Sequence, residues 1–118
     1  MISMREAYEK IGANYDDACA RLMGEEMLAR FALKFLDDES MDKLEAAMAA
    51  GDAKEAFMAA HTLKGVSQNL GFDNLYEPAV VVTEALRGAD FVDGAREGMH
   101  ALQQQYAATM SALREAAE

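Results

Sequence analysis

His61 is the side chain in this 118-residue sequence best suited to chemistry, because polar partners follow it at helical spacing. Lys64, Gly65 and Gln68 lie three, four and seven residues later, offsets that return to one face of an α-helix. An imidazole with an unperturbed pKa of about 6.5 is largely neutral at pH 7, so an exposed ring can act as a nucleophile without an activating base. Lys64 could supply a point charge beside an added anion, and Gln68 an amide donor.

The helix that carries His61 has two distinct faces when residues 53–70 are projected at about 100° per residue. One face is formed by Ala56, Ala59, Ala60, Leu63, Val66, Ser67 and Leu70. The opposite face carries Lys54, His61, Gly65 and Gln68, with Lys64 at its edge. A histidine that only fills a core would lie on the apolar face, so the projection predicts that His61 points outwards.

Gly65, Phe57 and Met58 indicate that a partner approaches this outer face. Glycine inside a helix costs roughly 1 kcal/mol relative to alanine, so Gly65 indicates a place where a side chain is unwelcome. Phe57 and Met58, one turn before His61, fall on its side and leave apolar area next to the ring. We expect these two residues to dock a partner, although packing of either one against a neighbouring helix is an equal alternative.

Capping residues and glycines divide the rest of the chain into amphipathic helices with short connections. The expected helices cover residues 3–12, 14–24, 25–51, 52–70, 73–87 and 91–116. Ser3 with Glu6, Asn14 or Asp16, Asp52 with Glu55, and Asp73 or Asn74 are the expected N-terminal caps. Phe91, Ala95, Met99, Leu102, Tyr106, Met110 and Leu113 form the apolar stripe of the last helix.

Two of these helices are less well defined by the sequence. The acidic segment 37–40 either breaks the third helix or only bends it. Pro78 has to lie in or just after the first turn of the helix over residues 73–87, and the valines at 80–82 favour a strand locally.

The composition predicts an all-α protein, with 24 Ala and 9 Met against 5 Val, 2 Ile and 3 Thr. Short connections between long helices predict an antiparallel up-and-down four-helix bundle with one or more additional short N-terminal helices. A chain of this length suits a single domain over residues 1–118.

The net charge argues against nucleic acid and membrane surfaces as partners. A formal net charge of −10 without a basic cluster disfavours nucleic acid and anionic membranes. The longest apolar runs have five residues, as in 56–60, and the N-terminus has no apolar core typical of a signal peptide, so we expect a cytoplasmic protein. The lone cysteine, Cys19, agrees with a reducing compartment.

The histidines also argue against a metal or cofactor bundle. His61 and His100 are the two histidines of the chain, and neither belongs to a Glu-x-x-His pair. We therefore expect no metal or cofactor of its own, and His100 is expected at the surface or at its boundary.

The segment around His61 resembles the motif of histidine-containing phosphotransfer (HPt) domains. The resemblance rests on Ala60, His61, Thr62, Leu63, Lys64, Gly65, Val66, Ser67, Gln68, Asn69, Leu70 and Gly71. It extends more weakly over residues 14–116, including Ala50-Gly51-Asp52 and the Leu86-Arg87 ending of the next helix, while Pro78 and the valines at 80–82 depart from the family pattern.

The resemblance implies a phosphorelay intermediate. In such a protein His61 is the phosphoacceptor, Lys64 and Gln68 support it, and Gly65 leaves it accessible. The implied partners are a response-regulator receiver domain, which brings the Mg²⁺, and a hybrid histidine kinase. We expect a monomeric phosphoryl carrier without kinase activity of its own.

Two rival functions differ in what they require. A kinase dimerisation helix normally has an acidic residue directly after its histidine and a proline a few positions later, where this chain has Thr62 and Val66. An adaptor bundle that docks signalling partners without carrying phosphate is the alternative that the sequence leaves open.

Overall fold

Side-chain caps define the starts of several helices in this computed structural model, which describes residues 1–117. Ser3 and Glu6 form a reciprocal capping box at the start of α1 (Met4–Ile11). Asn14 accepts a hydrogen bond from the backbone of Asp17 and opens α2 (Tyr15–Arg21). The predicted caps of these two short helices are therefore confirmed, although α2 ends three residues before Gly24, which instead precedes α3 (Glu25–Lys34).

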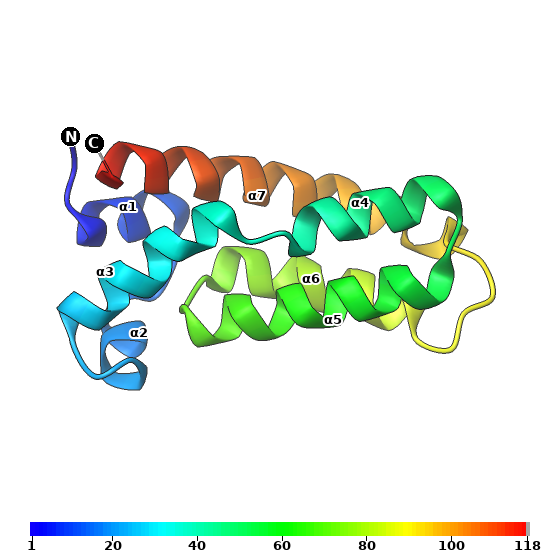
Figure 1. The fold of residues 1–118 in the computed structure, drawn as a ribbon, viewed down its shortest axis with the longest axis horizontal. Coiled ribbons are helices and arrows are strands. Elements are labelled where there is room, and N and C mark those ends of the chain that lie inside the picture. Colours follow the sequence, from blue (N-terminus) through cyan, green and yellow to red (C-terminus); the bar gives the residue numbers. More distant parts are fainter. Residues whose placement is uncertain (118) are drawn as a thin grey trace.

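Four longer helices form an antiparallel up-and-down bundle (Figure 1). They are α4 (Ser40–Ala50), α5 (Ala53–Asn69), α6 (Asp73–Leu86) and α7 (Arg96–Ala117). The remaining short helices α1, α2 and α3 gather at one end, where the N-terminus lies near the end of α7 (Figure 1). Residues 1–117 contain no strand, so the all-α class and the bundle are confirmed.

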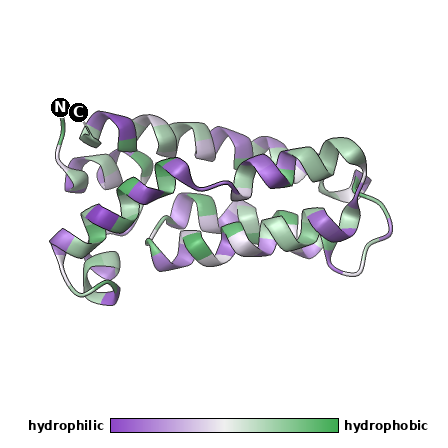
Figure 2. Cartoon of the chain, in the orientation of Figure 1, coloured by the Kyte–Doolittle hydropathy of each residue, from purple (hydrophilic) through white to green (hydrophobic). Residues whose placement is uncertain are grey.

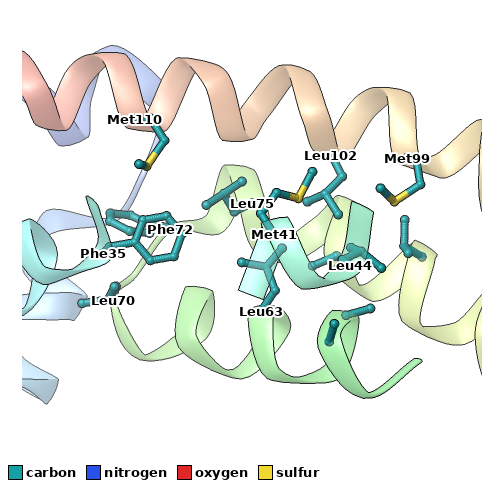
Figure 3. Close-up of a cluster of buried hydrophobic side chains, with 14 of the residues drawn as sticks. Phe35, Met41, Leu44, Leu63, Leu70, Phe72, Leu75, Met99, Leu102 and Met110 are labelled. Atoms are coloured by element: carbon teal, nitrogen blue, oxygen red, sulfur yellow. The ribbon is translucent and has the colours of Figure 1, made fainter. Parts of the chain in front are cut away.

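The core lies between the four long helices. Hydrophobic and hydrophilic residues alternate along each of them, as amphipathic helices require (Figure 2). Figure 3 shows the side chains that meet at the centre: Phe35, Met41, Leu44, Leu63, Leu70, Phe72, Leu75, Met99, Leu102 and Met110. Each of these is at most 5% exposed, so the bundle buries one continuous apolar interior.

The N-terminal helices are fastened to the end of α5 by its backbone. Tyr8 donates its hydroxyl to the carbonyl of Leu70 at 2.6 Å, and the Asn14 N–H donates to the carbonyl of Gly71 at 2.8 Å. The Arg21 guanidinium donates to the carbonyl of Gln68. The carbonyls of Gln68 and Gly71 also accept backbone N–H groups of Gly71 and Asp73, so the N-terminal helices add further partners to the acceptors that a helix end exposes.

The acidic segment after α3 breaks the helix, which settles the alternative left open by the sequence. A short 3₁₀ turn (η1, Phe35–Asp37) ends at Asp38, whose backbone is extended. The Asp38 carboxylate then accepts a hydrogen bond from the Ser40 N–H at the start of α4. Aspartate competes in this way with the backbone bonds of a continuous helix, and α3 consequently turns away from the axis of α4 (Figure 1).

The start of α6 differs from the prediction that Asp73 or Asn74 caps it. Phe72 is the N-terminal cap, and its phenyl ring cannot accept a capping hydrogen bond; the ring is buried against Tyr8 and Phe35 instead. Asn74 instead donates to Gln105 and Thr109 of α7.

Pro78 lies inside α6, just beyond the first turn, and the valines at 80–82 are helical. Val82 is fully buried, and its side chain lies so close to Gly98 that a Cβ added there would come within 3.2 Å of it. Packing against α7 therefore overrides the local preference of these valines for a strand.

The last helix begins five residues later than predicted. Residues Asp93–Ala95 form a 3₁₀ turn (η2), α7 begins at Arg96, and Phe91 is 75% exposed. Val92 is buried in the connection instead, so the inclusion of Phe91 in the apolar stripe was wrong. The other predicted members of the stripe are buried or half-buried.

Candidate functional site

The helix α5 is held firmly at both ends, which fixes the position of His61 at its middle. Asp52 accepts a hydrogen bond from the Glu55 N–H at 3.1 Å and caps the start, as predicted. At the other end Gly71 has a left-handed backbone (φ +70°), and the Phe72 N–H donates to the carbonyl of Ser67.

His61 is exposed on the outer face of α5, which confirms its predicted direction. Gln68 is exposed as well, and Lys64 and Gly65 are partly exposed on the same face. The buried residues of the helix are Ala53, Ala56, Ala59, Ala60, Leu63 and Ser67. The four residues predicted for the site therefore share one accessible surface.

Phe57 connects His61 to the neighbouring helix. Its ring is stacked with the imidazole, with centroids 5.9 Å apart and an angle of 17° between the planes. The Arg87 guanidinium lies over the same phenyl ring, 5.1 Å from its centroid. Phe57 is half-buried and packs against the core, as one of the two alternatives expected, and its contact with a partner stays a prediction.

Arg87 and Glu84, at the end of α6, are site residues for which the sequence predicted no role. The Arg87 guanidinium donates two hydrogen bonds to the Glu84 carboxylate, at 3.0 and 3.1 Å. These bonds are the main reason that the pKa of Glu84 lies below its usual range and that of Arg87 above it. The positive charge of Lys64 also lowers the pKa of Glu84, but by less than Arg87 does.

The sequence does contain a signal for Arg87. In two antiparallel helices joined at Gly71, residues equally distant from the turn lie side by side. Phe57 is fourteen residues before Gly71 and Arg87 is sixteen after it. This counting, combined with the outward direction of Phe57, would have placed a cation beside the ring.

Met58 lies on the other flank of His61 from Phe57. It is 53% exposed and lines an open groove of about 590 Å³ between α4 and α5. Thr62 and several alanines line the same groove. Gly65 is also open, since a Cβ added to it would meet no atom within 4 Å outside its own helix. The surface around His61 is therefore accessible on the α4 side.

The remaining reactive side chains lie apart from this face. His100 is exposed on α7, as predicted, next to a surface hollow that Glu45 and Arg96 also line. Cys19 is half-buried and free. Within residues 1–117, no three His, Cys, Asp or Glu side chains are grouped so that they could hold a metal ion.

Comparison with known proteins identifies the class to which this bundle and its outward histidine belong. The family model of the Hpt domain matches residues 26–117, so the chain is a member of the Hpt domain family. Membership implies a role in histidine phosphotransfer within two-component phosphorelays. Members of this family are generally phosphocarriers that interact with receiver domains and kinases.

Neither the curated proteins nor the solved structures include a significant match to the chain. In the part of the chain that the structure describes, no helix is both long and apolar enough to cross a bilayer.

Proposed function

We propose that this protein is a phosphorelay intermediate that carries a phosphoryl group on His61 and exchanges it reversibly with the aspartate of a receiver domain. The observation that carries the proposal is the exposed imidazole at the centre of α5, inside the segment that matches the Hpt family. Lys64 and Gln68 on the same face, and Arg87 from α6, are the groups that would surround the added phosphate.

The nucleophile on this side of the interface is a ring nitrogen of His61. The lone pair of one imidazole nitrogen attacks phosphorus in line with the aspartyl oxygen. The N–P bond forms as the O–P bond breaks, and the carboxylate of the receiver leaves with the electron pair. The other ring nitrogen keeps its proton, and the reverse step returns the group to aspartate. Lys64 and Arg87 stabilise the negative charge on the phosphoryl oxygens.

The metal ion belongs to the partner in this proposal. Phosphoryl transfer commonly uses Mg²⁺ to neutralise charge on the transferred oxygens. We infer that the receiver domain supplies this ion, and that this chain supplies the nucleophile and the cations. The same proposal assigns no kinase activity to the chain and places it in the cytoplasm as a monomer, with a hybrid histidine kinase as a further partner.

Phe57 and Met58 are the proposed apolar contacts with the receiver. A Phe57→Ala variant is expected to bind the receiver about tenfold more weakly, because buried aromatic anchors at interfaces are commonly worth more than 1 kcal/mol. Isothermal titration calorimetry measures the affinity, and circular dichroism shows that the bundle remains folded. Phe91→Ala, which removes an exposed phenyl ring outside α5, should leave the affinity unchanged. Equal affinities of the wild type and Phe57→Ala would exclude Phe57 from the interface.

Gly65 is expected to lower the stability of α5 and to keep His61 accessible to the receiver. Since nothing lies near its added Cβ, Gly65→Ala should raise the free energy of unfolding by about 1 kcal/mol. The methyl group should also slow transfer from the receiver roughly 10- to 100-fold, because small displacements in the reacting geometry have effects of this size. Phosphoramidate, a small phosphoryl donor, should label both proteins at the same rate. A receiver transfer rate that does not change would show that no partner approaches this position closely.

The proposed function is tested by the chemical stability of the phosphate bond that forms on this chain. The wild-type protein is incubated with a ³²P-labelled receiver and Mg²⁺, and the label on this chain is tested for stability to acid and to alkali. A phosphohistidine is labile to acid and stable to alkali, and we expect it in the peptide that contains His61. A chain that takes up no label from receivers or from phosphoramidate would leave only an adaptor role.

A further inference from the structure

Glu84 is linked to His61 through the side chains of Arg87 and Phe57. Its carboxylate accepts both hydrogen bonds from Arg87, and this guanidinium lies over the ring that stacks on His61. Arg87, one of the two cations that would neutralise a phosphoryl group, is therefore already partly neutralised by Glu84.

We propose that Glu84 is a positioning residue that holds the Arg87 guanidinium over Phe57 and competes for it with a phosphoryl group on His61. The inference rests on the proposed phosphoryl transfer to His61. While His61 is free, Glu84 keeps the guanidinium over Phe57. Once His61 carries phosphate, the same carboxylate draws the guanidinium away from the phosphate and repels the phosphoryl dianion. Glu84 thereby raises the free energy of the phosphorylated form and favours return of the group to the receiver.

The geometry makes this competition effective. Arg87 and His61 both contact the ring of Phe57, at 5.1 and 5.9 Å from its centroid, so the guanidinium and the imidazole are separated by no more than this one side chain. Over such separations salt at physiological ionic strength weakens the electrostatic interactions, and 1 M salt weakens them much further. Glu84 and Arg87 are both about half exposed, which leaves the guanidinium free to turn towards the phosphate.

The test replaces the charge and keeps the shape of Glu84. Glu84→Gln is compared with the wild type and with Glu77→Gln, which changes the net charge equally at an exposed position two turns earlier in α6. Each protein is mixed with the same phosphorylated receiver and Mg²⁺, and the ratio of phosphohistidine to phosphoaspartate is measured at equilibrium. We expect Glu84→Gln to raise this ratio roughly 3- to 10-fold, which corresponds to one charge interacting through a largely aqueous surface. The increase should shrink in 1 M salt.

The outcomes separate this inference from the function on which it rests. An equal ratio of phosphohistidine to phosphoaspartate in Glu84→Gln and Glu77→Gln would overturn the role of Glu84. The phosphorelay function would still stand in that case, provided that the receiver labels His61. An increase that persists in 1 M salt would also contradict the electrostatic competition. If neither the receiver nor phosphoramidate labels wild-type His61, both proposals fail together.

Discussion

Replacement of His61 by glutamine is expected to abolish phosphate uptake from both receiver and phosphoramidate. Glutamine is polar and of similar size, so the exposed position tolerates it without loss of the fold, but its amide nitrogen has no free lone pair with which to attack phosphorus. The measurement is acid-labile ³²P on the purified chain after transfer. No label above background is expected.

The other histidine of the chain provides the matched control. His100 is also exposed and helical, but it lies on α7 and not on the outer face of α5. A His100→Gln variant should take up phosphate as fast as the wild type. Label that remains in His61→Gln and disappears in His100→Gln would transfer the acceptor role to α7, and equal labelling of both variants would place the phosphate elsewhere.

Replacement of Gly71 by alanine is expected to cause the largest loss of stability of the changes considered. Its backbone is left-handed, and an added Cβ would lie 2.6 Å from the carbonyl oxygen of Asn14 and 2.9 Å from the Cβ of Ala18. The strained backbone and the displaced α2 together should cost on the order of 3 kcal/mol. Urea denaturation followed by circular dichroism measures the change.

A second glycine separates the two contributions to this loss. Gly51 has the same left-handed backbone, with φ of +71°, but a Cβ there would meet nothing within 4 Å. Gly51→Ala should therefore cost only about 1 kcal/mol, the expense of the backbone conformation alone. Equal losses in the two variants would show that α2 moves aside freely, and that its contact with Gly71 contributes little to stability.

The sequence predicts well where local chemistry decides the outcome. Capping by Ser3, Asn14 and Asp52 involves residues three positions apart, so the relevant atoms are fixed by the helix itself. The outward direction of His61 follows in the same way from the period of α5. For these features, no knowledge of the rest of the molecule is needed.

The prediction is weaker where packing between helices competes with local preference. Phe91 is hydrophobic and in register with α7, but the buried position in this connection is taken by Val92. Asp73 has the right chemistry for a cap, but the buried ring of Phe72 places the start of α6 one residue earlier. Both outcomes depend on which side chain fits the core, and a pattern of single residues does not contain that information.

The charged groups around His61 show the same limit. Lys64 and Gln68 are found from spacing within one helix, whereas Arg87 and Glu84 come from the next helix. Their position depends on how α6 is rotated about its own axis, which buried side chains such as Val82 and Leu86 decide. The members of the site that belong to α5 were therefore predictable from one helix. Arg87 could be placed near Phe57 by counting across the turn at Gly71, but its contacts with Phe57 and Glu84 needed the assembled bundle.

The fastening of the N-terminal helices to α5 has a consequence for how this protein can change in evolution. Tyr8, Asn14 and Arg21 all bind backbone carbonyls of residues 68–71 and none of their side chains. Substitutions at Gln68 and Asn69, both exposed, therefore leave these anchors intact. The surface next to His61 can therefore change in sequence to suit a new partner while the N-terminal helices stay attached to α5.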